Sequence, residues 1–204
     1  MLAAFMAGTV AALAVPPGVV PGVYINEEEV YFDTLAKRVA APWTSLRVGG
    51  ATVTAVGAFD RPAKTPSGTL RASGDRLTLT LADGRTSELR RARPVTCWGS
   101  VPRAVKKPDA SEDWLFERSL KLHDQGGRVA FGGGDTGAAP IVLRVRNVVW
   151  PSGPNQPSVV LYVHTPDKPD HAEAYSWADP GARRVGINLR WMQASCTIDQ
   201  ETRP

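Results

Sequence analysis

Residues 76–84 read Arg-Leu-Thr-Leu-Thr-Leu-Ala-Asp-Gly, and this stretch indicates the fold class most directly. From residue 77 to residue 81 leucine alternates with threonine, which is the period of two typical of a β-strand with one buried face. The dipeptide Asp83-Gly84 favours a two-residue type I′ hairpin turn, because both central residues of that turn need a positive φ. Residues 85–91 then return the chain, so the stretch predicts an antiparallel hairpin.

The same alternation, broken by turn residues, recurs along most of the chain after residue 69. It is clearest at residues 184–191, where valine, isoleucine, leucine and tryptophan share one side of the predicted strand. Many short strands without a clear long helix favour an antiparallel β-sandwich or β-barrel over β–α–β units. We therefore predict an all-β fold of about nine strands. The predicted strands cover residues 69–71, 76–82, 85–91, 94–99, 114–122, 128–131, 141–150, 158–164 and 184–191.

The length and composition exclude several classes of protein. A chain of 204 residues with 43% apolar residues can bury a core, so it is not disordered over most of its length. No apolar run reaches the roughly 20 residues that a membrane-spanning helix needs, so we expect no transmembrane span. The length also fits one domain, and we predict a single β-rich domain over residues 15–204.

One segment is compatible with either a helix or a strand. Asn26 and Glu29 have the spacing of a helix capping box. The flanking residues 23–25 and 30–32 are β-branched or aromatic, which is typical of strands. The sequence therefore leaves open one short N-terminal helix between residues 27 and 39.

The N-terminal stretch has features of an export signal. Residues 2–15 form an uncharged, mostly apolar run of the length found in secretory signals. Ala12-Leu13-Ala14 has the small-x-small pattern that signal peptidase accepts, so we predict an export segment at residues 1–14 and a mature start at Val15. The usual positive leader is missing, because no Lys or Arg precedes Lys37. A buried helix of a cytosolic protein and an uncleaved anchor are the alternatives.

The two cysteines also favour an oxidising compartment. Cys97 and Cys196 are not part of a Cys-x-x-Cys pair, and two cysteines in an exported domain more often form one bridge than stay free. We predict a Cys97–Cys196 disulfide in a periplasmic or secreted protein; two unrelated buried thiols are the alternative. Two sulfurs without a suitably spaced histidine do not suggest a tetrahedral metal site, and we predict no cofactor.

Positive charge is concentrated in one part of the chain. Residues 61–107 hold eleven Lys or Arg and three Asp or Glu, a local net charge of +8 in a chain whose net charge is +4. Such a region attracts polyanions, and for an exported protein we expect anionic polysaccharide or lipid head groups, not nucleic acid. The alternative is a solvated sheet edge whose charges discourage aggregation. The arginines predicted to bind are Arg71, Arg85, Arg90, Arg91 and Arg93.

Six tryptophans supply a second kind of binding group. Trp150 and Trp177 lie near Pro or Gly in predicted loops or strand ends, so we predict that they stack on sugar rings. Trp43 and Tyr175 have similar surroundings. The alternative is that nearly all the rings are packing residues, and we predict that role for three of them. These three lie at apolar strand positions: Trp98, Trp114 and Trp191.

Two weaker patterns suggest hydrolytic chemistry. Asp135-Thr136-Gly137-Ala138 matches the short motif around the catalytic Asp of aspartic proteases, which pair two carboxylates around a water molecule. The match departs from that family at residues 132–134, where three glycines replace apolar residues. His164, Asp167 and His171 are potential metal ligands without a recognised spacing. Both patterns are also explained by polar turns between strands.

The sequence therefore favours an extracytoplasmic, noncatalytic binding or structural module. Its expected ligand is an acidic or carbohydrate component of the cell envelope, bound by the arginines and by Trp150 and Trp177. A small-molecule carrier with a calyx-type barrel is one alternative. A hydrolase that uses Asp135 or a His164/Asp167/His171 metal site is another. The sequence implies no particular oligomeric state.

Overall fold

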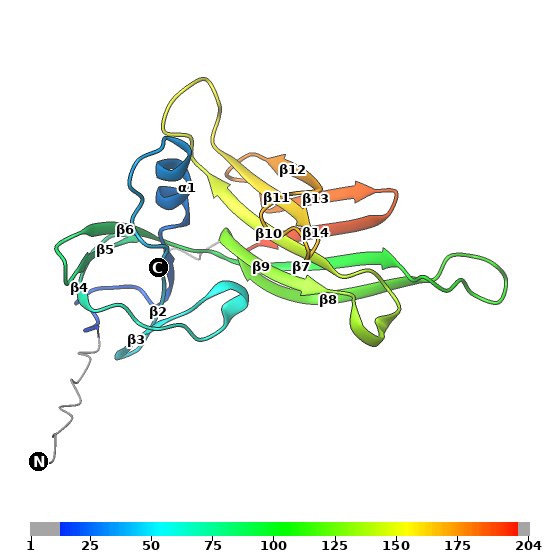
Figure 1. Ribbon diagram of the computed structural model, residues 1–204, viewed down its shortest axis with the longest axis horizontal. Coiled ribbons are helices and arrows are strands. Elements are labelled where there is room, and N and C mark those ends of the chain that lie inside the picture. The colour runs from blue at the N-terminus through cyan, green and yellow to red at the C-terminus, as the bar shows by residue number, and fades with distance from the viewer. Residues whose placement is uncertain (1–12, 200–204) are drawn as a thin grey trace, which may run out of the picture. The chain divides into compact units, whose positions relative to one another are not determined.

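The computed structural model describes residues 13–199, which contain 14 β-strands, one α-helix and two short 3-10 turns (Figure 1). Half of these described residues are in strands and 8% are in helices, and every strand pair among them is antiparallel. The predicted all-β antiparallel class is confirmed. The described chain forms two compact units: unit 1 holds residues 13–57 and 61–91, and unit 2 holds residues 58–60 and 92–199. Residues 1–12 of the predicted export segment lie outside the described part.

Unit 1 is one six-stranded sheet with the strand order β3-β2-β1-β6-β5-β4. Both edge strands supply side chains to the same core, Val53 from β3 and Leu70 from β4, so the sheet curls into a half-barrel. Leu13, which is 3% exposed, also packs in this core. A mature chain that begins at Val15 would lack it. The strands are β1 (Gly22–Ile25), β2 (Ser45–Gly49), β3 (Thr52–Ala55), β4 (Gly68–Ser73), β5 (Arg76–Leu81) and β6 (Thr86–Arg91).

The segment that the sequence left open forms a helix, α1 (Glu27–Leu35). Asn26 precedes it but makes no side-chain cap. Its amide instead donates to the hydroxyl of Ser87 on β6 and accepts from the backbone N–H of Thr44. Ser87 in turn donates to Glu29, so the capping box that the spacing suggested does not form. These two polar side chains hold the helix to the sheet.

The β5–β6 hairpin is correctly predicted, but its turn is not the expected type I′. The backbone N–H of Leu81 donates to the carbonyl of Arg85, which leaves Ala82, Asp83 and Gly84 as a three-residue loop. Gly84 has a φ of +84°, whereas Asp83 is not among the residues with positive φ. This is the common three-residue hairpin loop, a type I turn followed by a left-handed glycine.

Unit 2 is a sandwich of two four-stranded sheets, with the orders β12-β11-β10-β9 and β13-β14-β7-β8. Its core lies between them and includes Leu143 and Leu161 from the first sheet and Val95 and Met192 from the second. The strands are β7 (Pro94–Pro102), β8 (Trp114–His123), β9 (Gln125–Phe131), β10 (Ile141–Val148), β11 (Ser158–His164), β12 (Ala174–Ala178), β13 (Arg184–Leu189) and β14 (Met192–Ile198). The 3-10 turns are η1 (Ala58–Asp60) and η2 (Gly134–Thr136).

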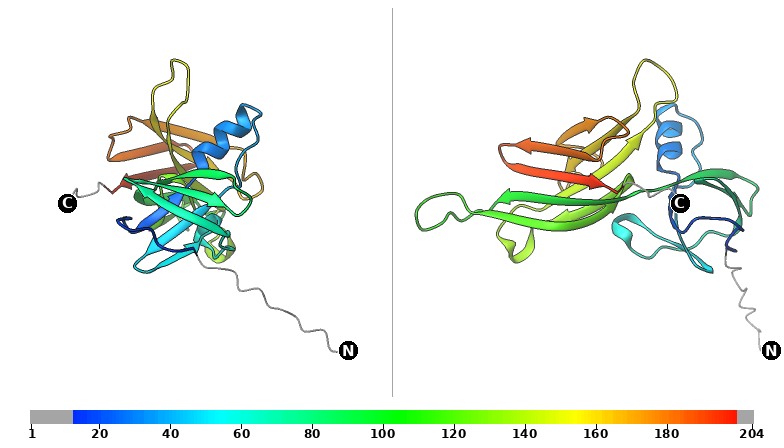
Figure 2. Two further views of the ribbon diagram at one scale, coloured as in Figure 1. Left: turned by 90° about the vertical axis from the view of Figure 1, so that its left-hand side faces the viewer. Right: turned by 180° about the vertical axis from the view of Figure 1, so that it is seen from behind.

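Two loops of unit 2 project beyond its sheets in both Figure 1 and Figure 2: the β7–β8 loop and the β10–β11 loop. The second of these lines the groove described below.

The predicted disulfide is present between the two central strands of the second sheet. Cys97 on β7 and Cys196 on β14 lie directly opposite each other, with their Cα atoms 4.0 Å apart, and both are buried in the core. The bridge therefore joins two strands of one sheet, and it links segments 99 residues apart in the sequence.

The nine predicted strands all exist, and the structure adds five: β1, β2, β3, β12 and β14. The predicted strand at residues 184–191 ends at Leu189, where a tight turn leads into β14. Each unit has its own core. That the two units unfold together as the single domain predicted over residues 15–204 stays a prediction.

Candidate functional site

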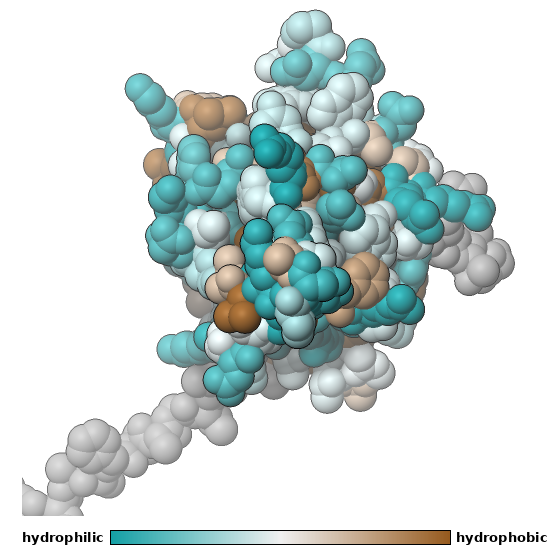
Figure 3. All heavy atoms as spheres, turned by 90° about the vertical axis from the view of Figure 1, so that its right-hand side faces the viewer, coloured by the Kyte–Doolittle hydropathy of each residue, from teal (hydrophilic) through white to brown (hydrophobic). Residues whose placement is uncertain are grey.

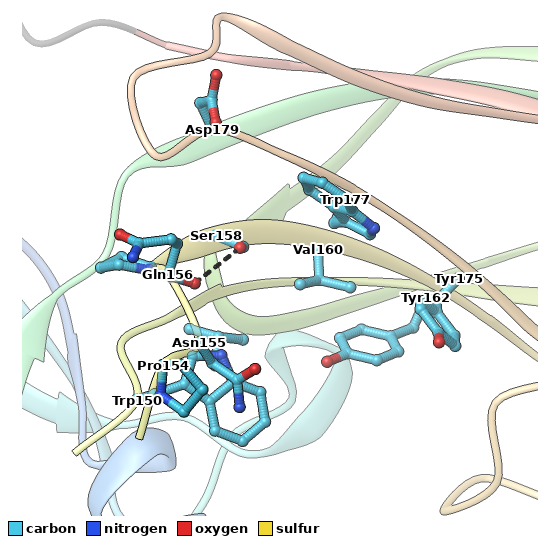
Figure 4. A pocket seen from close by; sticks show the side chains of 12 residues that line it. Trp150, Pro154, Asn155, Gln156, Ser158, Val160, Tyr162, Tyr175, Trp177 and Asp179 are labelled. Atoms are coloured by element: carbon cyan, nitrogen blue, oxygen red, sulfur yellow. Dashed lines mark hydrogen bonds between the residues drawn. The ribbon is translucent and has the colours of Figure 1, made fainter. Parts of the chain in front are cut away.

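A groove with a cavity volume of about 690 Å³ runs along β11 and β12 of unit 2 and under the β10–β11 loop (Figure 4). This volume lies in the range of small-molecule sites. Four of the lining residues are aromatic: Trp150, Tyr162, Tyr175 and Trp177. In Figure 4 their rings surround Val160, which lies at the centre of the view.

Strand alternation places these side chains. Val159, Leu161 and Val163 of β11 point into the sandwich core, so Val160 and Tyr162 point out of it. On the neighbouring edge strand β12, Trp177 lies opposite Val160 and Tyr175 lies opposite Tyr162. Tyr175 and Trp177 are each 66% exposed, so two large rings face solvent side by side on one strand.

The β10–β11 loop completes the groove. It contributes Trp150, which is 36% exposed, together with Pro154 and Pro157, whose rings restrict the backbone. Asn155 and Gln156 add amide groups that can donate and accept hydrogen bonds. The hydroxyl of Ser158 donates to the backbone carbonyl of Gln156 at 3.0 Å, the dashed line in Figure 4. Asp179 supplies a carboxylate beyond the end of β12.

The structure thus brings Trp150 and Trp177, the two predicted stacking residues, to one groove. Trp43 is exposed in unit 1, where its indole N–H donates to Glu27 at 2.7 Å. The sequence interpretation missed Tyr162, because the nearly continuous apolar run at residues 158–164 is typical of a strand buried on both faces. The signal that identifies it is the alternation along β11, where Val160 and Tyr162 point outward between core residues. These core residues are Val159, Leu161 and Val163.

The expected core positions of Trp98, Trp114 and Trp191 are wrong. Trp191 lies in the β13–β14 turn and is 41% exposed, because the turn after Leu189 shifts the pattern and gives the buried position to Met192. Trp98 is half-buried and stacks on Phe116, with ring centroids 5.3 Å apart. The indole N–H of half-buried Trp114 donates to Glu112 at 3.0 Å.

Two of the predicted arginines lie on the outward face of the unit 1 sheet. Arg71 on β4 lies opposite Thr78, and Arg90 on β6 lies opposite Arg76 on β5. Arg76 forms an ion pair with Glu88 on the same face. The side chains of Arg71, Arg76 and Arg90 therefore face away from the leucine core of this unit.

Arg85 and Arg91 lie apart from this face. Arg85, in the β5–β6 loop, forms an ion pair of 2.8 Å with Asp83, and hydrogen bonds from Arg85 lower the pKa of this exposed carboxyl group. Arg91 lies opposite buried Tyr24, on the other side of the sheet from Arg90, and donates to the backbone carbonyl of Pro21 at 3.2 Å.

Arg93 belongs to unit 2 and is bound to a buried carboxylate. Its backbone N–H and its Nε donate to Asp124 at 2.8 and 2.7 Å, and Asp124 is 0% exposed. The backbone carbonyl of Asp124 accepts from Asn147 at 2.7 Å, so the pair joins the start of β7, the β8–β9 corner and β10. The five predicted arginines therefore do not share one surface, and their part in ligand binding stays a prediction.

The residues of the hydrolytic alternatives do not assemble into a site. Asp135 is exposed in η2, a turn whose flanking residues Gly133 and Gly137 have positive φ, and it makes no hydrogen bond or ion pair within residues 13–199. His164 is 2% exposed, whereas Asp167 and His171 are exposed. Over the same described range, no three His, Cys, Asp or Glu side chains are placed to share a metal ion.

His164 has a structural setting instead. Its Nδ1 lies 3.0 Å from the backbone carbonyl of His171, to which the protonated nitrogen donates. Burial lowers the pKa of His164, and the nearby positive charges of Arg144 and Arg128 lower it further. The imidazole is therefore neutral at neutral pH.

The side of the molecule at which the β7–β8 loop projects is mostly hydrophilic, with apolar residues in small separate areas (Figure 3). Lys106 and Lys107 of this loop are exposed, while Arg103 forms an ion pair of 3.2 Å with Asp113. Within residues 13–199, no helix has the length and apolar character needed to cross a membrane.

The groove offers groups for binding. Its described lining combines four aromatic rings with amide, hydroxyl and carboxylate groups and contains no His, Cys or Lys side chain. Comparisons with protein-family models, curated proteins and solved structures found no match for this chain. The function is therefore argued from the geometry of the groove.

Proposed function

We propose that this protein is an extracytoplasmic, noncatalytic binding module whose unit 2 groove holds a carbohydrate of the cell envelope. The observation that carries the proposal is the grouping of four aromatic side chains around one open groove, two of them two-thirds exposed. Aromatic side chains are normally buried for their large apolar area, so a cluster left exposed on a sheet indicates an interaction site.

Aromatic rings suit sugars for an electrostatic and a hydrophobic reason. The face of an aromatic ring carries partial negative charge, and the C–H groups on the face of a sugar ring carry partial positive charge. Stacking the two faces also removes apolar surface from water. Trp177, on a paired strand, offers such a face in a fixed orientation, and Trp150 offers a second one from the proline-rich loop.

The polar lining suits the hydroxyl groups of a sugar. Asn155 and Gln156 can each donate and accept, Ser158 can accept, and the carboxylate of Asp179 accepts from hydroxyl donors. Polar groups that fix the orientation of a ligand between apolar contacts are the usual composition of a small-ligand site.

The disulfide supports an extracytoplasmic location. Disulfides persist in oxidising compartments and are rare in the cytosol, and the Cys97–Cys196 bridge is buried in the core of unit 2. The apolar N-terminal run is consistent with export. We do not propose the calyx-type carrier, because apolar side chains fill the space between the two sheets of unit 2.

The test is glycan binding by the wild-type protein and by Trp177→Ala. A panel of neutral and acidic oligosaccharides is screened first, and the affinity for the best ligand is then measured by calorimetry. Loss of a stacking ring at the centre of a site costs at least about tenfold in affinity. Trp191→Ala is the matched control, because Trp191 is an exposed indole of the same unit outside the groove.

Binding that Trp177→Ala weakens and Trp191→Ala leaves unchanged supports the proposal. Absence of binding to every glycan contradicts it, and so does equal binding by the two variants.

A further inference from the structure

We infer that the carbohydrate is acidic, and that Arg144 and Arg128, next to the aromatic groove, bind its carboxylate. The inference rests on the proposed function and adds the charge of the ligand. It also assigns the ionic contact to two arginines outside the basic segment at residues 61–107.

The aromatic and basic side chains form one row across a single sheet. Tyr175 on β12 lies opposite Tyr162 on β11, Tyr162 lies opposite Arg144 on β10, and Arg144 lies opposite Arg128 on β9. Residues directly opposite each other in a sheet point to the same face. Neighbouring strands are about 4.8 Å apart, so the row extends roughly 14 Å across the sheet.

The members of the row are close in space. The ring centroids of Tyr162 and Tyr175 lie 6.3 Å apart, and the guanidinium carbon of Arg144 lies 5.9 Å from the Tyr162 ring centroid. The second distance is within reach of a cation–π contact, which holds the guanidinium beside the aromatic ring. A ligand stacked on the tyrosines therefore has a positive charge at its edge.

Arg128 adds a second positive charge at the end of the row. It is half-buried, and within residues 13–199 it has no carboxylate partner. Burial keeps the His164 imidazole neutral, and the two guanidinium groups lie close enough to lower its pKa further. The positive charge beside the tyrosines therefore comes from the arginines.

An acidic sugar can contact both the tyrosines and the arginines of the row. Guanidinium groups bind carboxylates through paired, nearly parallel hydrogen bonds, which gives both energy and orientation. A uronic acid carries a carboxylate on the same ring that stacks, so one ligand residue can contact a tyrosine and an arginine together. A proline-rich peptide would use the rings but would bring no carboxylate to the two arginines.

Two exposed arginines of unit 2 provide an internal comparison. Arg184 on β13 lies opposite Thr197 on β14, Arg190 lies in the β13–β14 turn, and neither lines the groove. Replacing this pair removes as much charge from the protein as replacing Arg128 and Arg144. The Arg184 and Arg190 pair is therefore a matched control.

The experiment uses uronic acid oligosaccharides and their carboxyl-reduced, neutral counterparts as probes. Calorimetry compares the wild-type protein with Arg128→Gln/Arg144→Gln and with the control Arg184→Gln/Arg190→Gln. We expect the wild type and the control to bind at least one acidic oligosaccharide about tenfold more tightly than its neutral counterpart, as one charged hydrogen-bonded contact provides. The preference should disappear in Arg128→Gln/Arg144→Gln.

Circular dichroism checks the fold of each variant. If the glutamine double variant does not fold, Arg128→Lys/Arg144→Lys keeps the charge without the guanidinium fork and is expected to retain only part of the preference. The comparison of acidic and neutral ligands on the wild type needs no variant.

Equal affinity for acidic and neutral oligosaccharides overturns the inference, as does a preference that survives in Arg128→Gln/Arg144→Gln or is lost in the control. In these cases sensitivity to Trp177→Ala leaves the proposed function standing. Binding of a proline-rich peptide with no glycan bound overturns both.

Discussion

Unit 1 and unit 2 both carry arginines on the outward face of an antiparallel sheet, but the neighbours of these arginines differ. In unit 1, Arg71 lies opposite Thr78, and Arg90 lies opposite Arg76 and Ile25. In unit 2, Arg144 lies opposite Tyr162, beside a groove with four aromatic rings. The basic segment at residues 61–107 includes Arg71 and Arg90 but not Arg144. Cross-strand neighbours, and not local charge density, therefore distinguish the candidate site.

The two units also differ in how they are held together. Unit 1 is a single curled sheet around one core, and unit 2 is a two-sheet sandwich that contains both cysteines and the buried Arg93–Asp124 pair. The response of each unit to changes in unit 2 therefore tests this difference.

The largest effect is expected from removal of the disulfide. Cys97→Ala/Cys196→Ala should lower the free energy of unfolding of unit 2 by about 4–5 kcal/mol, because the bridge closes a long loop in the unfolded chain. Urea unfolding measures the loss. Hydrogen exchange with peptide resolution should show faster exchange in residues 141–164 and little change in residues 76–91.

The wild-type protein in a reductant is the parallel sample and should behave as the double variant does. Equal loss of protection in both units would show that they unfold as the single domain predicted from the sequence.

An intermediate effect is expected at the buried ion pair. Asp124→Ala leaves the guanidinium of Arg93 without its partner and should cost about 3 kcal/mol of unfolding free energy. Asp83→Ala breaks the Arg85 pair of unit 1, which is exposed to solvent, and no measurable change is expected. Urea unfolding of the two variants in parallel compares a buried with an exposed pair. A similar cost for both would contradict the structural role assigned to Asp124.

The smallest effect is a pH dependence that arises at His164. Its pKa is lowered in the folded protein, first by burial and then by Arg144 and Arg128, while the hydrogen bond to the His171 carbonyl and the charge of Asp170 oppose the shift. The unfolded chain therefore takes up a proton first as the pH falls through the ordinary value of 6.5. The stabilisation is present above that pH and is lost as the pH falls toward the folded pKa.

Unfolding free energies measured between about pH 8 and pH 5 test this expectation. His164→Gln should lose this part of the pH dependence. Parallel curves for His164→Gln and the wild type would show that His164 titrates normally.

The alternation of leucine and threonine at residues 76–81 predicted a strand correctly because both of its faces have a clear character, core on one side and solvent on the other. β12 was missed because its alternation is reversed in kind: large rings face solvent, and alanine and serine face inward. β14 was missed because the apolar pattern of residues 184–191 extends β13 to Trp191, whereas the chain turns after Leu189 and Met192 begins a new strand.

The candidate site was predicted only in part. Trp150 and Trp177 were identified as exposed rings, since Pro and Gly in the neighbouring sequence indicate surface loops. Their meeting in one groove depends on the register between β11 and β12, which no local pattern fixes.

The sequence alone determined the fold class and the β5–β6 hairpin, because hydrophobic period and turn residues act locally along the chain. The pairing of the two cysteines was predicted from their number. Only the tertiary structure decided which arginines have aromatic neighbours, which ones are held by carboxylates, and that two compact units form. These properties depend on the order and register of strands from distant segments, and that register is set by the packing of a whole core.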